Sequence, residues 1–268
     1  MQFNREWIEG RLNGKSMRAY RVRPQAAGDK PLPTVLVIQE IWGVDEHIQD
    51  MADRFAAAGY EAIAPDLFSY GDTPAALKAP RIQAVKRFLD TMPPAGWGNP
   101  DVMQQHLDTL PADEAQKIQE TQKLLFGPKD EENFIAQLKQ WTNRGLEHGP
   151  AVLSIGYCMG GRLAFLLACH DQRIKAAVCN YGTAPSDAEL AQLQSPVYGF
   201  YGGTDHRITD AVPGVAEKLK ELGKTFHYAI YPEAGHAFFN DSRASYDVDA
   251  ARQAWSETLH FFDQVLAH

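Results

Sequence analysis

One stretch near the middle of the chain, Ala151 to Arg162 (A-V-L-S-I-G-Y-C-M-G-G-R), constrains the fold more than any other. Its apolar start, Ala151 to Ile155, has the length and β-branched content of a buried strand, and an apolar pattern compatible with a helix resumes at Leu163. The letters G-Y-C-M-G between them have the G-x-S-x-G spacing of a nucleophile elbow, with cysteine in place of serine. The stretch therefore predicts a strand, a sharp turn that carries Cys158, and a helix.

The residues around this turn suit a reactive thiol. A side chain at Gly156 or Gly160 would collide with the adjoining strand and helix, so both positions need glycine. The N-terminal end of the following helix carries partial positive charge, which favours a thiolate and an incoming oxyanion. The alternative is a plain Gly-rich turn that holds a buried cysteine, and other parts of the chain must discriminate between the two.

The chain on either side alternates strands and helices. Asn13-Gly14 between two short strand-like segments predicts an N-terminal β-hairpin. Residues 34–38 form a continuous apolar strand, Asp45 is a candidate cap for the next helix, and residues 61–65 give another strand. Later strands are expected over 176–182, 196–201 and 226–231, with helices after the candidate cap Asp210 and near the C-terminus. This order predicts an α/β fold with a mostly parallel central sheet, helices on both faces and an N-terminal hairpin.

Residues 71–150 depart from this alternation. Pro and Gly cluster over 93–100, which predicts a loop, while 101–126 and 130–144 each have helical spacing. Two interpretations stay open: an enlarged crossover that feeds the elbow strand, or a helical cap over the active site. The segment is longer than one crossover requires. In either case we expect a single domain over residues 1–268 with a helical insertion or cap at about 71–150.

Composition and charge exclude several classes of protein. A formal net charge of −8 argues against nucleic acid or an anionic membrane as a partner. The 3 cysteines fit a reducing compartment better than a disulfide framework. No signal peptide or membrane-spanning run is visible. The histidines lack H-E-x-x-H spacing, and C-x-x-C, Walker and dinucleotide motifs are absent. We expect a cytoplasmic monomer or small homo-oligomer without a metal site.

Three residues with complementary chemistry each follow an expected strand. Cys158 comes first, Asp205 follows a later strand, and His236 follows the next one. Parallel sheets gather such residues in loops at the carboxyl edge of their strands, and nucleophile, acid and histidine occur here in the order that a triad requires. An aspartate alone is more often a helix cap, and a histidine alone is more often a surface residue. All three together predict a Cys-His-Asp triad.

Four segments of the chain resemble the dienelactone hydrolase (carboxymethylenebutenolidase) family. They are V-I-Q-E-I-W-G-V (37–44), A-P-D-L-F (64–68), G-Y-C-M-G-G (156–161) and A-G-H-A-F (234–238). The similarity spans almost the whole chain except roughly 71–150. It implies an α/β-hydrolase fold, a Cys-His-Asp triad and hydrolysis of a lactone or related small ester, without a metal or organic cofactor.

The chemistry of these residues agrees with that resemblance. His236 is expected to take the thiol proton, while Asp205 holds the imidazole tautomer. The backbone N–H groups of Ile41 and Met159 are expected to form the oxyanion hole. The family pattern also assigns Glu40 a contact with the nucleophile, although a loop glutamate can equally be a solvated residue.

The substrate-binding residues depart from the family pattern. The bacterial enzymes that this chain resembles have an arginine four residues past the catalytic histidine, where this chain has Asn240. Their second arginine falls in the divergent segment, where Arg81 and Arg87 are both candidates. The dienelactone substrate therefore does not follow, and an uncharged ester or lactone is the expected small-molecule partner. The residues expected to contact it are Trp42, Tyr157, Phe238 and Arg81.

Two other classes of function remain open from the sequence. A non-enzymatic binding protein could keep the fold, although it would be expected to have a broken triad. An acyl transferase or peptidase could use the same nucleophile, because the acceptor of the acyl group decides between these activities and hydrolysis.

Overall fold

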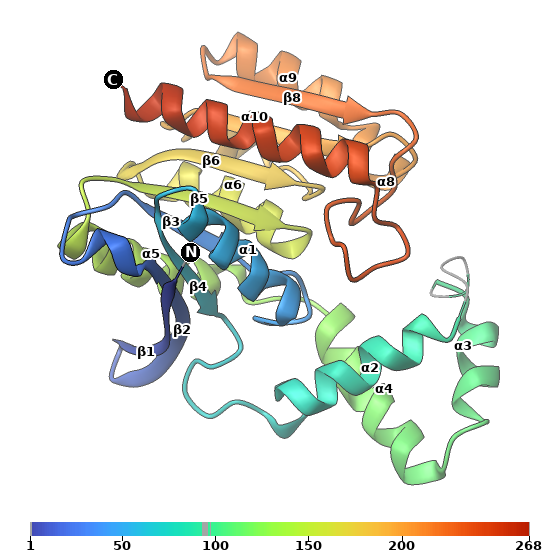
Figure 1. Ribbon diagram of the computed structural model, residues 1–268. Coiled ribbons are helices and arrows are strands. Elements are labelled where there is room, and N and C mark those ends of the chain that lie inside the picture. Colours follow the sequence, from blue (N-terminus) through green and yellow to red (C-terminus); the bar gives the residue numbers. More distant parts are fainter. Residues whose placement is uncertain (1, 93–95, 97, 268) are drawn as a thin grey trace.

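The computed structural model describes residues 2–92, 96 and 98–267, which fold around an eight-stranded sheet (Figure 1). The strand order is β1-β2-β4-β3-β5-β6-β7-β8. The pairs β1/β2 and β2/β4 are antiparallel, and the other neighbouring pairs are parallel. The strands are β1 (Phe3–Leu12), β2 (Lys15–Pro24), β3 (Thr34–Ile38), β4 (Glu61–Asp66), β5 (Val152–Tyr157), β6 (Ile174–Asn180), β7 (Val197–Gly202) and β8 (Phe226–Tyr231).

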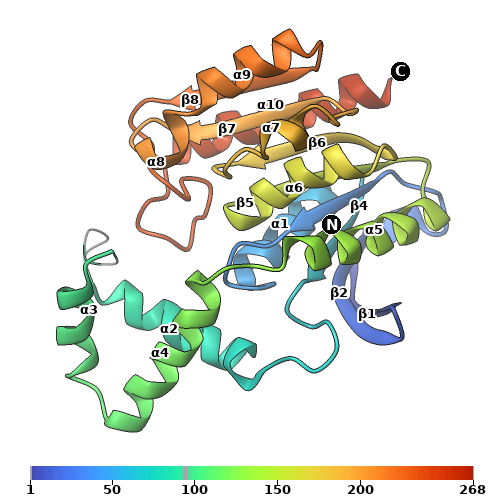
Figure 2. The ribbon, with the colours of Figure 1, turned by 180° about the vertical axis from the view of Figure 1, so that it is seen from behind.

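Helices cover both faces of this sheet. Helices α1 (Glu46–Ala57) and α10 (Val248–Leu266) pack on one face, and α5 (Glu131–His148), α6 (Met159–His170) and α9 (Val212–Glu221) pack on the other, as Figures 1 and 2 show. The expected mostly parallel α/β sheet with two helical layers and an N-terminal hairpin is confirmed. The shorter elements are α7 (Asp187–Leu190), α8 (His206–Thr209) and the 3₁₀ turns η1 (Gln25–Ala27) and η2 (Ala75–Leu77).

Local sequence explains these elements. Asn13 and Gly14 have φ angles of 51° and 77°, the left-handed pair that a two-residue hairpin turn requires. Strand β3 is buried along its whole length, and its alternate side chains enter the apolar clusters on opposite faces of the sheet. Asp45 caps α1 as expected, because its side chain accepts a hydrogen bond from the backbone N–H of Ile48.

Two details of the expected helices are wrong. Residues 101–126 form two helices, α3 (Pro100–Leu107) and α4 (Ala112–Phe126), because Pro111 disfavours helical geometry in the residue before it. Asp210 does not cap α9, whose N-cap is Ala211. The Asp210 carboxylate instead lies 3.2 Å from Nδ1 of His206.

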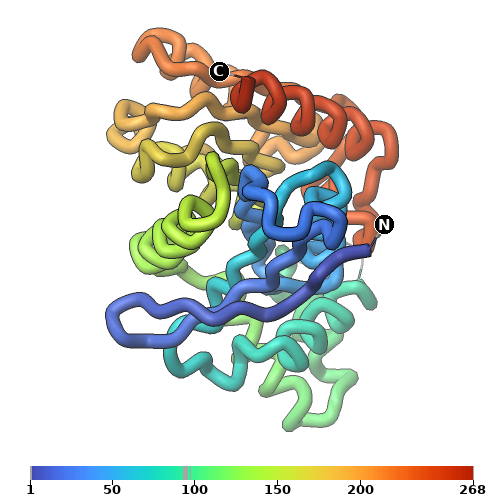
Figure 3. Tube along the Cα trace, turned by 60° about the vertical axis from the view of Figure 1, so that its left-hand side comes forward, coloured from blue at the N-terminus to red at the C-terminus, as the bar shows by residue number. Residues whose placement is uncertain are grey.

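Segment 71–150 contains two different structures. Helix α5 packs on the sheet and is the crossover helix that leads to β5. Helices α2 (Ala79–Asp90), α3 and α4 form a separate group, which Figure 3 shows at one end of the molecule, away from α10. Their apolar side chains, including Ile82, Phe88 and Ile118, share one cluster with Trp42. Residues 93–95 and 97 of the expected loop lie outside the described residues.

Candidate active site

The nucleophile candidate Cys158 lies in a strained turn between β5 and α6. Its φ and ψ angles of 53° and −114° are unusual for a residue with a side chain, and such strain costs of order 1–3 kcal/mol. A Cβ atom on Gly156 would lie 1.8 Å from the carbonyl oxygen of Gly160. A Cβ atom on Gly160 would lie 2.2 Å from the carbonyl oxygen of Ile38 at the end of β3. The close packing expected at both glycines is present.

Cys158, His236 and Asp205 lie together at the carboxyl ends of the parallel strands. Asp205 follows β7 and His236 follows β8, and Nδ1 of His236 lies 2.6 Å from Oδ2 of Asp205. The His236 ring also hydrogen-bonds Cys158. Burial opposes the imidazolium, but these hydrogen bonds and the charges of Cys158 and Asp205 raise the pKa of His236 to about 10. This raised pKa favours the protonated form of the His236 ring at neutral pH.

The other two cysteines have different surroundings. Cys169 and Cys179 are buried, whereas Cys158 is partly exposed. Burial raises the pKa of the Cys169 thiol to about 12 and that of the Cys179 thiol to about 11. Of the 3 cysteines, Cys158 alone combines access to solvent with a neighbouring base, the two features that favour reactivity in a thiol.

Glu40 follows β3 and is 2% exposed. Its carboxylate accepts a hydrogen bond of 3.2 Å from the Tyr181 hydroxyl and one of 2.8 Å from Nδ2 of Asn240. The Tyr181 ring packs edge-on against the ring of His236, with 5.2 Å between the ring centroids. Glu40 is therefore a buried, doubly hydrogen-bonded carboxylate that is connected to the His236 site through Tyr181.

The residues expected to bind the oxyanion are placed by two different elements. Ile41 lies in the turn after β3, and Met159 is the first residue of α6, where a backbone N–H has no carbonyl partner inside the helix. Trp42, the next residue after Ile41, is 6% exposed. Its ring lies 6.2 Å from the ring of Phe126 at the end of α4, and the Arg243 guanidinium lies 5.5 Å from its centroid.

Three residues expected to contact substrate lie elsewhere. Tyr157 and Phe238 are 0% exposed, because both rings belong to the apolar cluster between the sheet and the layer of α1 and α10. Arg81 joins α2 to α4, where its Nη2 atom donates to the Lys117 carbonyl at 2.6 Å and to the Glu120 carboxylate at 3.1 Å. The burial of Tyr157 and Phe238 argues against their expected contact with substrate, whereas Arg81 stays a candidate whose guanidinium is paired within the α2–α4 group.

Two residues near the nucleophile were not identified from the sequence. Tyr181 directly follows β6, and its position after a parallel strand was the available signal. Lys129 lies after α4, where its ammonium donates to the carbonyl oxygens of Leu124, Leu125 and Gly127. Burial lowers the pKa of Lys129, and the electrostatic interaction with Cys158 opposes this effect. Lys129 thus adds positive charge close to the thiol.

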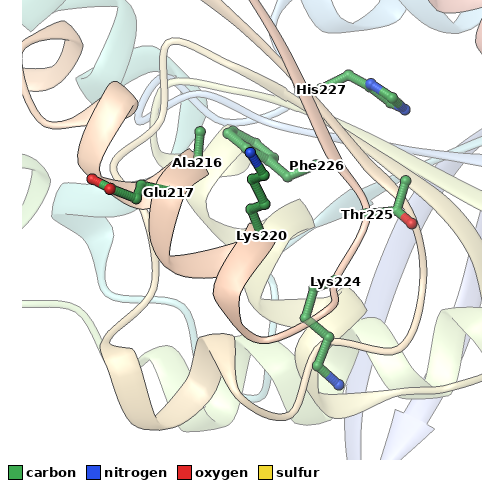
Figure 4. A pocket seen from close by; sticks show the side chains of 7 residues that line it. All are labelled: Ala216, Glu217, Lys220, Lys224, Thr225, Phe226 and His227. Atoms are coloured by element: carbon green, nitrogen blue, oxygen red, sulfur yellow. The ribbon is translucent and has the colours of Figure 1, made fainter.

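One surface cavity lies away from these residues. It has a volume of about 620 Å³ and is lined by residues of α9 and the start of β8, including Lys220, Lys224 and Phe226 (Figure 4). Cys158 lies at the opposite, carboxyl edge of the sheet. Within the described ranges, no cluster of three or more His, Cys, Asp or Glu side chains is suited to hold a metal ion. No helix in the described part of the chain has both the length and the apolar character needed to span a membrane.

The chain is similar in sequence to known proteins over most of its length. The model of the "Dienelactone hydrolase family" matches residues 17–266. A "Putative carboxymethylenebutenolidase" of Escherichia coli O157:H7 is 32% identical over 262 residues, which cover 94% of this chain and 83% of that protein. A protein of the same name from Saccharolobus solfataricus is 32% identical over 255 residues, covering 94% of this chain and 96% of that protein.

A solved structure gives the same result for the fold. The crystal structure of a "Putative Dienelactone Hydrolase" from Klebsiella pneumoniae superposes with a TM-score of 0.70 at 29% identity, over 98% of this chain and 100% of that one. The fold is therefore the expected α/β-hydrolase fold. Since the family model covers almost the full length and the sequence relatives exceed 30% identity over most of both chains, this chain belongs to the dienelactone hydrolase family, whose hydrolases act on esters or lactones.

Proposed function

We propose that the protein hydrolyses a lactone or small carboxylic ester through a Cys158-His236-Asp205 triad and a thioester acyl-enzyme. The observation that carries this proposal is the continuous contact from Cys158 to His236 and on to Asp205, with 2.6 Å between the last two residues. The strained backbone of Cys158 supports the same conclusion, because such strain persists where function requires it.

The proposed reaction has two halves. The Cys158 thiolate attacks the ester carbonyl, and the tetrahedral intermediate collapses to a thioester as the alkoxide leaves. The His236 imidazolium gives its proton to that alkoxide, while Asp205 holds the ring orientation. His236 then deprotonates a water molecule, which attacks the thioester. The C–S bond breaks, the carboxylic acid is released, and Cys158 is regenerated as a thiolate. In a lactone, acid and alcohol remain parts of one molecule.

The intermediate needs stabilisation of its oxyanion. The backbone N–H of Met159 at the start of α6 and that of Ile41 after β3 are the donors in this proposal, and the helix N-terminus adds positive potential. Losing one donor of this kind typically costs about 10²–10³ in kcat.

The substrate class follows from the state of three cations that could pair with a substrate carboxylate. Arg81 is engaged by Glu120, Arg243 lies 3.1 Å from the Asp90 carboxylate, and the Lys129 ammonium is bound by backbone carbonyls. A substrate carboxylate would have to displace one of these partners. We therefore propose an uncharged lactone or ester as the preferred substrate.

The test is a screen of p-nitrophenyl esters, neutral lactones and dienelactone with the purified protein, followed by mass spectrometry of the quenched enzyme. Turnover and a covalent acyl group on Cys158 would support the proposal. Absence of turnover with every substrate would favour a binding protein that has kept the fold. Transfer of the acyl group to an added alcohol or amine in preference to water would favour an acyl transferase or peptidase.

A further inference from the structure

Strand β8 forms an open edge of the sheet. It is the last strand in the sheet order and pairs with β7 on one side, and within the described ranges no strand pairs with its other side. Figure 1 shows β8 at the end of the sheet that lies away from the β1–β2 hairpin. Each of its residues is partly or fully exposed. An edge of this kind offers unpaired backbone groups to another chain.

The backbone groups of β8 alternate between the two sides of the strand. The carbonyl groups of Thr225 and Tyr231 accept hydrogen bonds of 3.1 and 2.7 Å from backbone N–H groups at the start of β7 and just after its end. The pairing between β7 and β8 has no register shift. Because successive residues of a strand point their N–H and C=O groups to opposite sides, those of Phe226, Tyr228 and Ile230 point away from β7.

The two edge strands of the sheet differ in charge. Strand β8 (F-H-Y-A-I-Y) contains no Lys, Arg, Asp, Glu or Pro. Strand β1, at the other edge, has Arg5, Glu6, Glu9 and Arg11. Charged side chains and prolines on an edge strand oppose its pairing with another chain. The β1 edge therefore has this protection, whereas the β8 edge lacks it and presents Tyr228, which is 39% exposed.

The space beside the start of β8 is open on both faces of the sheet. On one face lies the cavity of about 620 Å³ between α9 and β8 (Figure 4). On the other face a second cavity of about 400 Å³ is lined by β8 and by residues of α10, including Glu257. Both cavities border on Phe226 and His227. The edge is therefore accessible to an added strand, with room for side chains above and below it.

We propose that β8 pairs in antiparallel fashion with β8 of a second copy of this chain, across a two-fold axis at Tyr228. This pairing joins the two sheets into one continuous sheet. Tyr228 lies opposite its own copy, and Phe226 lies opposite Ile230 of the partner subunit. Every outward N–H and C=O group from Phe226 to Ile230 then has a partner. A two-fold interface is self-complementary and closes at the dimer. This inference is independent of the proposed function of Cys158.

Polar side chains that line the two cavities fit this symmetry. On α9, Glu217 precedes Lys220, and on α10 the acceptor Glu257 precedes the donor Gln264. The axis between antiparallel neighbours is perpendicular to the sheet, so each helix meets its own copy running in the opposite direction. Acceptors on one subunit then face donors on the other, on both faces of the sheet. This matched order favours a second copy over an unrelated extended peptide.

Sedimentation velocity of the full-length protein over about a hundredfold range of concentration tests the proposal. The wild-type protein should form a dimer. Tyr228→Lys and Tyr228→Glu each place like charges opposite one another across the axis, so each should raise the dimer Kd by at least about tenfold. An equimolar mixture of the two variants should recover the dimer, because Lys then faces Glu. Circular dichroism checks that both variants are folded.

The other edge of the sheet provides a matched control. Trp7 in β1 is 43% exposed, so Trp7→Lys puts the same charge at a comparably exposed aromatic residue of an edge strand. This variant should dimerise like the wild type. Hydrogen exchange adds a readout at single amides. Dimerisation should slow exchange at Tyr228 and Ile230, whereas the amide of His227, which faces β7, should be protected at every concentration.

Four results would each overturn the proposal. They are a wild-type protein that stays monomeric at every concentration, a Tyr228→Lys protein that dimerises like the wild type, a mixture of the two variants that stays monomeric, and equal loss of the dimer in Trp7→Lys. A monomeric wild type that binds an extended peptide at β8 would assign this edge to a different partner. None of these measurements uses an ester, so their outcome is separate from that of the substrate screen.

Discussion

Nδ1 of His236 lies 2.6 Å from Oδ2 of Asp205, while the same ring hydrogen-bonds the Cys158 thiol. The imidazole is thus held between the Cys158 thiol and the Asp205 carboxylate, and the Asp205 side chain is 5% exposed. Despite the burial that opposes a charged ring, these contacts raise the pKa of His236 to about 10.

Activity should persist into the alkaline range and fall as the pH rises through about 10. Because the folded-state pKa of His236 is raised, the imidazolium that protonates the leaving group is present below that pH and lost above it. The same ion pair stabilises the fold fully below the ordinary histidine pKa and progressively less up to about pH 10. Profiles of kcat/KM against pH should show an alkaline limb that Asp205→Asn moves to lower pH. If Asp205→Asn leaves the alkaline limb in place, the group that titrates there is not His236.

Replacing the nucleophile should abolish hydrolysis without unfolding the protein. We expect Cys158→Ala to lower kcat by at least about 10³-fold, because no acyl-enzyme can form. Cys158→Ser should keep partial activity at most. Circular dichroism and thermal melting check the fold. Turnover at the wild-type rate in folded Cys158→Ala would refute the assignment.

The base and the nucleophile should act as a unit. His236→Ala is expected to lose about as much activity as Cys158→Ala, and the double variant should lose little more. Asp205→Asn should be less damaging but still severe, because it favours the wrong imidazole tautomer. Single-turnover kinetics with one p-nitrophenyl ester measures all of these effects. If the double variant instead shows the product of the two single losses in activity, His236 and Cys158 serve different steps.

Iodoacetamide should modify one of the 3 cysteines in the native protein. Cys158 should react at neutral pH, whereas burial and raised pKa values protect Cys169 and Cys179 until the chain unfolds. Peptide mapping before and after denaturation distinguishes the sites. Labelling of Cys179 at a rate comparable to that of Cys158 would mean that this part of the core opens readily.

Uncharged esters or lactones should have kcat/KM values at least comparable with that of anionic dienelactone. The reason is that Asn240 faces Glu40 and supplies no positive charge, while Arg81 and Arg243 pair with carboxylates. Matched neutral and anionic substrates measure this ratio. A strong preference for the anionic lactone that disappears in Arg81→Ala or Arg87→Ala would reverse the expectation.

The parts of the site that follow from local rules could be predicted from sequence. The elbow around Cys158 depends on neighbouring glycines, and the strand ends before Asp205 and His236 depend on short apolar runs. In contrast, the burial of Tyr157 and Phe238 depends on which side of the sheet each ring faces, and adjacency to Cys158 or His236 does not determine that. Such side-chain directions arise only in the packed fold.

The helical insertion was the least predictable part of the fold. Pro111 was a usable sequence signal for the break between α3 and α4. The spacing of Ile82, Val85 and Leu89 was a usable signal for helix α2. The partners of Lys86 had no comparable signal. Asp45 and Ser242 lie 41 and 156 residues away in sequence, so only tertiary packing brings them to one ammonium group.

The bond between Glu40 and Asn240 joins residues 200 positions apart. Closing so long a stretch of chain is entropically costly, and contacts of this separation form late in folding. During translation, Cys158 leaves the ribosome before His236 and Asn240 do, so a nascent chain carries the thiol without His236 beside it. Recovery of turnover after refolding should mark docking of the C-terminal segment, and not formation of the central strands.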